Sequence, residues 1–116
     1  MDCIFCKIIN GEIPCEKVLE TDNILAFKDI NPAADEHILI IPKKHIADID
    51  SFNNNDSIYA AEMIIAARDI AQKLNLNEKG YRLIINNGKA AGQDVFHLHL
   101  HILGGMDSLG PMIKKS

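Results

Sequence analysis

Hydrophobic and polar positions alternate most regularly near the C-terminal end of the chain, where residues 97–102 read His-Leu-His-Leu-His-Ile. Successive side chains of a β-strand point to opposite faces, so the three histidines of this segment share one face. Leu98, Leu100 and Ile102 then occupy the other face and can be buried in a core. The glycines at 104–105 mark the end of the strand. The pattern predicts a strand with an apolar side and an imidazole side.

Shorter apolar runs, bounded by turn residues such as proline and asparagine, predict four further strands. These strands cover residues 17–20, 24–29, 37–41 and 81–86. The run at 37–41 is almost entirely aliphatic, which is typical of a central strand buried on both faces. Residues 3–10 predict one or two turns of helix, which Gly11 closes in the left-handed conformation.

One long helix is predicted after position 56, with Asp56 or Ser57 as its N-cap. Its apolar residues recur at intervals of three and four and so form a single stripe, composed of Ala60, Met63, Ile64, Ala67, Ile70, Ala71 and Leu74. Hairpin-like strands together with one long helix indicate an α+β domain with an antiparallel sheet of about five strands and a short N-terminal helix. The 116 residues predict one domain, spanning 1–116.

The composition and charge of the chain limit the kinds of molecule it is expected to bind and the compartment in which it is expected to occur. A net charge of −4 and a pI near 5.6 argue against non-specific binding to nucleic acid or to a membrane surface. No segment has the length and hydrophobicity of a membrane span or a signal peptide. Three cysteines, an odd number, argue against a disulfide framework and favour a reducing compartment. The expected location is therefore the cytoplasm.

Three interpretations of the histidine row are compatible with its local sequence. The row can be a polar, half-solvated strand face, since histidine is intermediate in its burial habits. It can be a metal site, because alternate histidines on a strand offer imidazole nitrogens to zinc. It can also carry nucleophilic or acid–base chemistry, because histidine titrates near neutral pH.

The flanking sequence resolves this ambiguity through a family resemblance. The segment 97–102 resembles the histidine triad signature, in which three histidines alternate with hydrophobic residues. Further blocks resemble the same family, called HIT, at positions 4–9, 26–30, 37–45, 81–86 and 92–95. The ending Leu103-Gly104-Gly105 is similar to the nucleoside-phosphoramidase (Hint-like) branch rather than to the dinucleoside-polyphosphate hydrolases. The resemblance covers nearly the whole chain.

The resemblance implies a homodimer with a shared sheet that hydrolyses the bond between a purine nucleoside monophosphate and an amine. It implies that His99 is the nucleophile and forms a covalent nucleotidyl intermediate. An attacking imidazole needs an acceptor at its far nitrogen to fix the tautomer. His101 is the candidate for the phosphate and leaving-group side, and His97 and His37 complete the network. Taken without the resemblance, His37 is an ordinary packed residue at the entry of its strand.

The resemblance also implies a nucleotide pocket, whose purine slot is made by apolar residues near the N-terminus: Ile4, Phe5, Ile8, Phe27 and Ile30. Asp29 is the expected partner of the ribose hydroxyls, although it can also be a simple turn residue. Alternation turns Lys28 away from this slot. The phosphate is expected to meet the glycine-containing loop before the histidines, and the residues assigned to it are Asn86, Gly92, Gln93, Asp94 and Val95.

Asp94 stands where many members of this branch carry serine. A carboxylate beside an anionic phosphate is repulsive unless it is protonated or faces a cation. The sequence therefore suggests a preference for positively charged amine leaving groups, such as lysine conjugates.

A second motif, Cys3-x-x-Cys6, has a spacing that lets two thiolates reach one metal ion. In some bacterial members of the family, two histidines complete such a site, and their positions here are His45 and His97. The resemblance thus implies a structural zinc that the reaction itself does not require. The alternative is a pair of small, mostly buried cysteines beneath the short helix.

Other functions remain open at this stage. A dinucleoside-polyphosphate hydrolase would use the same histidines, and a non-catalytic nucleotide-binding or partner-binding module would use them only to hold AMP. A purely structural zinc protein is a further option, but it does not explain His99 and His101. The sequence does not specify the physiological amine, the purine base, the partner proteins or the role of Cys15.

Overall fold

The computed structural model describes residues 3–113 and contains a five-stranded antiparallel sheet. Its strands lie in the order β1-β2-β3-β5-β4. Their bounds are Lys17–Glu20 for β1, Ile24–Lys28 for β2, Glu36–Pro42 for β3, Arg82–Ile85 for β4 and Leu100–Gly104 for β5. The predicted α+β class, the number of strands and the central place of β3 are confirmed.

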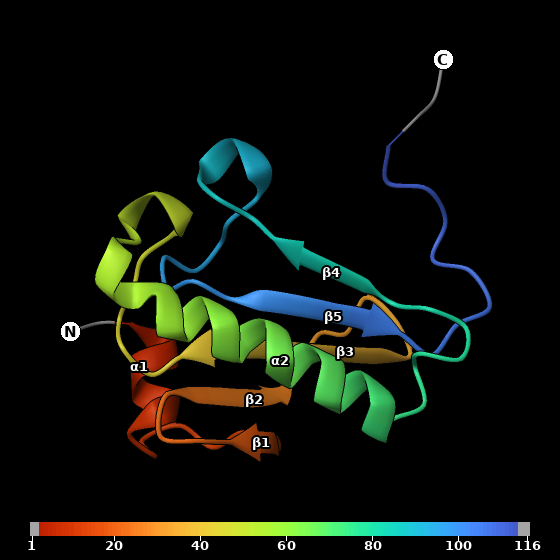
Figure 1. Cartoon of the computed structure of the whole chain (residues 1–116), viewed down its shortest axis with the longest axis horizontal. Helices are drawn as coiled ribbons and strands as arrows, with labels where there is room; N and C mark the ends of the chain where they lie inside the picture. The colour runs from red at the N-terminus through yellow and green to blue at the C-terminus, as the bar shows by residue number, and fades with distance from the viewer. Residues whose placement is uncertain (1–2, 114–116) are drawn as a thin grey trace.

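Two α-helices accompany the sheet, α1 (Ile4–Ile9) and the long α2 (Ser57–Lys73). Figure 1 shows α2 lying across the sheet. Gly11 follows α1 with a φ of 80°, as predicted for a left-handed helix end. Three short 3₁₀ segments occupy the connections: η1 (Ile49–Ser51), η2 (Asn54–Asp56) and η3 (Lys89–Ala91). Within residues 3–113, no helix combines the length and hydrophobicity needed to cross a lipid bilayer.

The sheet separates two apolar clusters, because alternate residues of each strand face opposite sides. On one side, Ile38 and Ile40 of β3 pack with the buried stripe of α2 and with Leu98, Leu100 and Ile102. On the other side, Leu39 and Ile41 pack with Leu25 and Phe27 of β2 and with Phe5 and Ile8 of α1. The predicted alternation in 97–102 is therefore confirmed, since its three aliphatic residues join the α2 side.

The helix α2 differs from the prediction in which of its residues are buried. Its buried residues are Met63, Ala66, Ala67, Ile70 and Ala71, whereas Ala60 is exposed and Ile64 is 54% exposed. Ile64 was expected in the stripe because its spacing fits, but it lies at the margin of the buried helix face and stays outside the core cluster. Asp56 is the N-cap residue of α2, as predicted, but its side chain makes no capping hydrogen bond to the helix; its carboxylate binds the backbone N–H of Asn53 and the Lys44 ammonium instead.

The histidine strand also begins later than predicted. Ladder pairing with β3 and β4 starts only at Leu100, opposite Ile40 and Ile85. Residues 97–99 lie before the strand and are held differently, with the Leu98 N–H donating to the Ile46 carbonyl at 2.7 Å. β4 ends at Ile85, so none of its residues stands opposite positions 97–99. Consequently, the first two histidines of the row come from an irregular segment and only His101 comes from β5.

Candidate active site and metal centre

A cavity of about 220 Å³ opens on the side of the sheet that carries the histidines. Its apolar walls include all five residues predicted for the purine slot, which the structure brings together: Ile4, Phe5, Ile8, Phe27 and Ile30. The cavity is also lined by five other residues that were predicted to bind the nucleotide: Asp29, Asp94, Val95, His99 and His101. A largely apolar cavity with a few convergent polar groups is the usual form of a small-molecule site.

His99 is held in a single tautomer by the backbone. Its Nδ1 lies 2.8 Å from the carbonyl oxygen of His97, and the ring is only 4% exposed. A carbonyl can only accept, so Nδ1 carries the proton and donates it. In the neutral ring, Nε2 is then unprotonated, and its lone pair is available to attack an electrophile.

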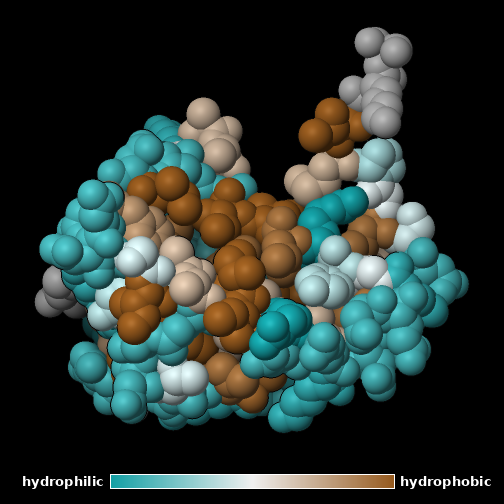
Figure 2. All heavy atoms as spheres, in the orientation of Figure 1, coloured by the Kyte–Doolittle hydropathy of each residue, from teal (hydrophilic) through white to brown (hydrophobic). Residues whose placement is uncertain are grey.

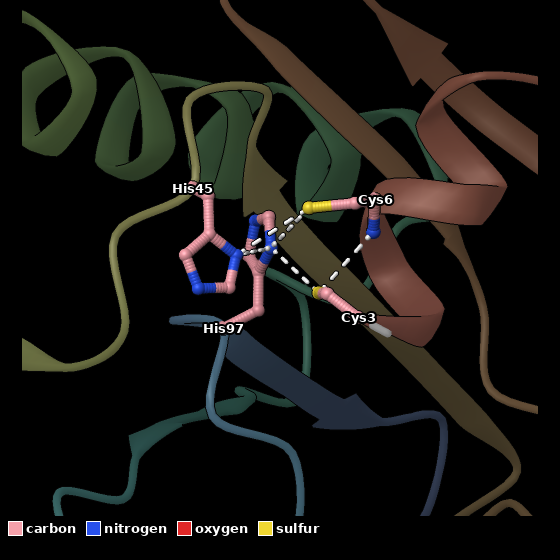
Figure 3. A group of neighbouring side chains, drawn as sticks. All are labelled: Cys3, Cys6, His45 and His97. Atoms are coloured by element: carbon pink, nitrogen blue, oxygen red, sulfur yellow. Dashed lines mark hydrogen bonds between the residues drawn. The ribbon is translucent and has the colours of Figure 1, made fainter. Parts of the chain in front are cut away.

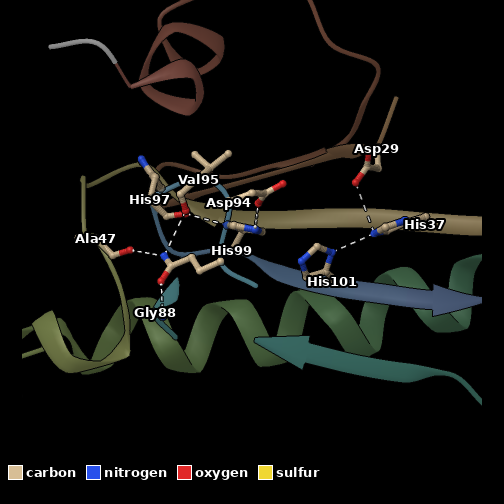
Figure 4. Close-up of polar contacts among 10 residues, drawn as sticks. Asp29, His37, Ala47, Gly88, Asp94, Val95, His97, His99 and His101 are labelled. Atoms are coloured by element: carbon tan, nitrogen blue, oxygen red, sulfur yellow. Dashed lines mark hydrogen bonds and ion pairs between the residues drawn. The ribbon is translucent and has the colours of Figure 1, made fainter. Parts of the chain in front are cut away.

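His101 and His37 form a directional chain of hydrogen bonds (Figure 4). The backbone N–H of Ala33 donates to His37 Nδ1 at 2.9 Å, so the proton of neutral His37 resides on Nε2. That nitrogen lies 2.9 Å from His101 Nδ1 and 3.5 Å from Asp29 Oδ2. His101 Nδ1 is therefore the acceptor, and its own proton is on Nε2. These hydrogen bonds leave the Nε2–H of His101 available as a donor to a ligand in the cavity.

Burial keeps these two imidazoles neutral. Desolvation lowers the pKa of His101 to about 4, with the neighbouring His99 and His37 rings adding to the effect. Desolvation also lowers the pKa of His37, although the Asp29 carboxylate partly opposes it. Asp29, His37 and His101 are close enough to suggest a cation site. However, Nε2 of neutral His37 is occupied by a proton, so the group is better described as a hydrogen-bonded relay.

The two aspartates of the cavity occupy different environments. Asp29 is 19% exposed; its Oδ1 accepts the N–H of Asn31 and its Oδ2 faces His37. It is therefore both a turn residue and a member of the site. Asp94 is 83% exposed, and its Oδ1 lies 3.7 Å from His99 Nε2. A carboxylate thus stands beside the nitrogen that carries the nucleophilic lone pair.

The loop before the histidines is organised by Gln93. This side chain is 5% exposed; its Oε1 accepts the Gly88 N–H, and its Nε2 donates to the carbonyls of Ala47 and Val95 (Figure 4). Gly88 and Gly92 both have a φ of 88°, which glycine adopts without strain. Gln93 thus fixes the loop through its own hydrogen bonds. Asn86, Gly92 and Gln93 are not among the residues that line the cavity.

Cys3, Cys6, His45 and His97 form a second cluster, in which all four candidate ligand atoms lie within 4.8 Å of one another (Figure 3). His97 Nε2 lies 2.8 Å from the Pro42 carbonyl and so must donate to it. Its Nδ1 is therefore unprotonated and faces the cluster. Such a second hydrogen bond, which fixes the tautomer, typically accompanies a metal-binding histidine.

The dimensions of this cluster fit a tetrahedral zinc ion. Zn–N bonds of about 2.0 Å and Zn–S bonds of about 2.3 Å place ligand atoms roughly 3.3–3.7 Å apart. His97 Nδ1 lies 3.2 Å from His45 Nδ1, 3.3 Å from Cys3 Sγ and 3.6 Å from Cys6 Sγ. Cys6 Sγ and His45 Nδ1 are 3.4 Å apart. The cluster can therefore bind a metal such as zinc.

Without a cation, the Cys6 thiol keeps its proton and the His97 ring is neutral. Burial, together with the adjacent Cys3 sulfur, raises the pKa of the Cys6 thiol to about 11. Burial lowers the pKa of His97 to about 4, against the opposing effect of its bond to Pro42. A bound divalent cation would lower the pKa of the Cys6 thiol again, because a cation stabilises the thiolate directly.

Some residues of the cavity were not anticipated: Ile13, Pro14, Cys15, Lys28 and Leu39. Lys28 was predicted to point away, yet it contributes to the wall, with its ammonium 3.0 Å from Glu16. Leu39 could have been found, because it alternates with His37 on the same face of β3. The segment 13–15 carries no pattern that places it there; it reaches the cavity because it connects α1 to β1.

Comparisons with known proteins agree with this geometry. Residues 10–108 match the HIT domain family model. The chain is 50% identical over 102 residues to an uncharacterized HIT-like protein of Helicobacter pylori, covering 88% of this chain and 95% of that protein. It is 50% identical to the solved HIT family hydrolase of Clostridium thermocellum, with a TM-score of 0.92 and 97% of each chain covered. A histidine triad nucleotide-binding protein of Candida albicans is 34% identical, with a TM-score of 0.82 over 99% of this chain and 86% of that one.

Proposed function

Because the chain belongs to the HIT family, we propose that it is a hydrolase that cleaves the P–N bond of purine nucleoside 5′-phosphoramidates, as in the Hint-like branch. The observation that carries the proposal is the fixed tautomer of His99, whose unprotonated Nε2 lies at the cavity that can hold a nucleoside. A tautomer held this way is a requirement of nucleophilic attack, whereas simple binding does not need it.

In the proposed reaction, His99 Nε2 attacks phosphorus and the bond from phosphorus to the amine breaks. His101 Nε2–H hydrogen-bonds a phosphoryl oxygen and then passes its proton to the departing nitrogen, so that the leaving group is the free amine. The His97 carbonyl stabilises the positive charge that develops on the His99 ring. Water then gives a proton to His101 while its oxygen attacks phosphorus, which breaks the nucleotidyl–histidine bond, releases the nucleoside monophosphate and restores both imidazoles. No step requires a metal ion or an organic cofactor.

The size of the cavity favours a mononucleotide substrate. Sites for drug-sized ligands occupy roughly 300–1,000 Å³, and the cavity of about 220 Å³ is smaller than this. One base and its ribose fit such a space better than a dinucleoside. We would compare kcat/KM for adenosine 5′-phosphoramidate and diadenosine tetraphosphate, and measure AMP binding by calorimetry. Preferred turnover of the phosphoramidate supports the proposal, whereas AMP binding without turnover indicates a binding module.

Asp94 is proposed to set the preference among amine leaving groups. Its exposed carboxylate, 3.7 Å from His99 Nε2, stands beside the reacting end of the cavity, where it would attract a cationic chain on the leaving amine. The quantity to compare is the kcat/KM for a lysyl phosphoramidate divided by the kcat/KM for a phosphoramidate of an uncharged amine. We expect Asp94→Ser to lower this ratio by about fivefold, which is the effect of one charge pair about 4 Å apart in water. Asp94→Asn, which removes only the charge, should have the same effect. An unchanged ratio in both variants contradicts this role.

The second cluster is proposed to hold a structural zinc ion through Cys3, Cys6, His45 and His97. With its Nε2–H on Pro42 and its Nδ1 facing the metal, His97 has no proton to exchange with a substrate. The metal therefore supplies fold stability and not chemistry. The five histidines of the chain thus divide between two sites. His45 and His97 belong to the metal cluster, and the proposed reaction uses the other three, His37, His99 and His101.

A homodimer is proposed to form along β4. Leu83 and Ile85 pair with Ile102 and Leu100 and so face the α2 side, yet they remain 38% and 37% exposed at the last strand of the sheet. Figure 2 shows apolar side chains gathered over the region of α2 and β4, and Ile64 adds to the exposed apolar surface. Such a patch marks an association surface.

The dimer is tested by light scattering after gel filtration. Leu83→Glu should convert a dimer of about twice the chain mass to a monomer, because it buries a charge at the interface. Ile49→Glu, at a residue 43% exposed outside α2 and β4, is the matched control and should remain dimeric. A Leu83→Glu variant of unchanged mass would exclude this surface.

A further inference from the structure

The proposed metal cluster and the catalytic histidine are joined by one short segment. His97 directs its ring nitrogen Nδ1 to the cluster, 3.3 Å from Cys3 Sγ, while its backbone carbonyl accepts the Nδ1–H of His99. One residue is thus both a candidate metal ligand and the acceptor that sets the tautomer of the nucleophile. A displacement of His97 on loss of metal would be transmitted directly to His99.

Phe5 provides a second connection. It lies between Cys3 and Cys6 on the first turn of α1. Its ring packs edge-on against two histidine rings, with centroid-to-centroid distances of 5.8 Å to His97 and 5.2 Å to His99. The same ring lines the nucleotide cavity. Aromatic pairs in this edge-on geometry attract each other beyond their burial. Phe5 therefore contacts both histidines and the space that the ligand would fill.

The helix α1 depends on outside anchors for its position. It has six residues, far fewer than an isolated helix needs to be stable in water. Its N-cap is Cys3, whose sulfur accepts the Cys6 N–H at 3.3 Å. A cation that holds both sulfurs fixes the first turn, which carries two cavity residues, Ile4 and Phe5. Occupancy of the cluster by a metal would therefore act on the shape of the cavity.

We propose that cation binding at the Cys3–Cys6–His45–His97 cluster and nucleotide binding in the cavity are thermodynamically linked, with Phe5 and His97 as the positioning residues that carry the linkage. The inference rests on the proposed function, because it takes AMP as the ligand of the cavity. Linkage is reciprocal: if the cation tightens AMP binding, AMP tightens cation binding by the same factor. Coupling of this kind is typically about 5–150-fold.

The test uses the zinc-loaded wild-type chain. AMP binding is first established by calorimetry, and zinc affinity is then measured by competition with a chromophoric chelator, with and without saturating AMP. We expect AMP to raise zinc affinity about fivefold or more. Unchanged zinc affinity while AMP is bound overturns the linkage and leaves the proposed function intact. A chain that binds no AMP overturns both.

Two matched variants test the route of the linkage. Phe5→Leu removes the ring that contacts both histidines; we expect it to bind zinc and AMP with a coupling factor below that of the wild type, because only the His97 connection remains. Phe27→Leu removes another cavity ring, which in the described part of the chain packs edge-on against Phe5 and against neither histidine. It should weaken AMP binding but keep the coupling factor. Equal coupling in both variants contradicts a role for Phe5.

A spectroscopic measurement tests the part played by His97. Nitrogen-15 shifts of the His99 ring report which nitrogen carries the proton. In the zinc-loaded chain we expect the Nδ1–H form alone, and after zinc removal a mixture of both tautomers. A single, unchanged tautomer in the zinc-free chain contradicts the positioning role.

Discussion

Replacing His99 by alanine is expected to reduce turnover of adenosine 5′-phosphoramidate by about a thousandfold to a millionfold, the range found when a covalent nucleophile is removed. The expectation follows from the unique state of this ring. His99 Nε2 is unprotonated because Nδ1 donates to the His97 carbonyl. His101 has the opposite tautomer, with its proton on Nε2, and therefore cannot replace His99 as the attacking group.

The same variant should still bind AMP, because the apolar walls of the cavity and Asp29 remain in place. We expect the Kd for AMP, measured by calorimetry, to change by less than about tenfold. Added imidazole should partly restore turnover, since it can enter the space left by the ring and attack phosphorus. Substantial turnover by a folded His99→Ala chain without imidazole would show that another group is the nucleophile.

Loss of the proposed zinc site is expected to cause the largest change in stability. A ligand present at about a thousand times its Kd stabilises the folded state by about 4 kcal/mol. For a domain of this size, the corresponding fall in Tm is roughly 10–20 °C. Cys6→Ser should therefore lose zinc, measured by elemental analysis, and should melt at a lower temperature than the zinc-loaded wild type.

Cys15→Ser provides the matched control for this experiment. Cys15 is partly buried like Cys6, but it lines the nucleotide cavity and is not a member of the metal cluster. The control should retain one zinc per chain and melt within a few degrees of the wild type. A wild-type chain that takes up no zinc, or a Cys6→Ser chain that keeps it, would show that the cysteines are only a buried pair.

The sequence predicted the parts of the fold that follow from local periodicity. Alternation in 97–102 placed the histidines opposite the aliphatic residues, and the aliphatic run of β3 placed that strand at the centre of the sheet. Helical spacing located α2 but did not predict that Ile64 lies on its exposed side. Spacing determines which residues share a face, but it does not determine how much of that face the tertiary structure covers.

The sequence indicated which residues belong to the site, but it did not indicate the tautomers of the histidines. The resemblance named His97, His99 and His101 as one group, yet the structure gives them three different environments. Their tautomers depend on Pro42, the His97 backbone and Ala33, and no spacing rule brings these acceptors and donors together. These partners are set by tertiary structure. For the same reason, residues 13–15 were not anticipated in the cavity wall.

The central claim is that hydrolysis proceeds through a covalent bond between phosphorus and His99. The most direct test is the stereochemical course at phosphorus, measured with a chiral adenosine phosphorothioamidate hydrolysed in oxygen-18 water. Each in-line displacement inverts the configuration, so attack by His99 followed by attack by water predicts overall retention. Overall inversion would mean that water attacks the substrate directly, and would contradict the account.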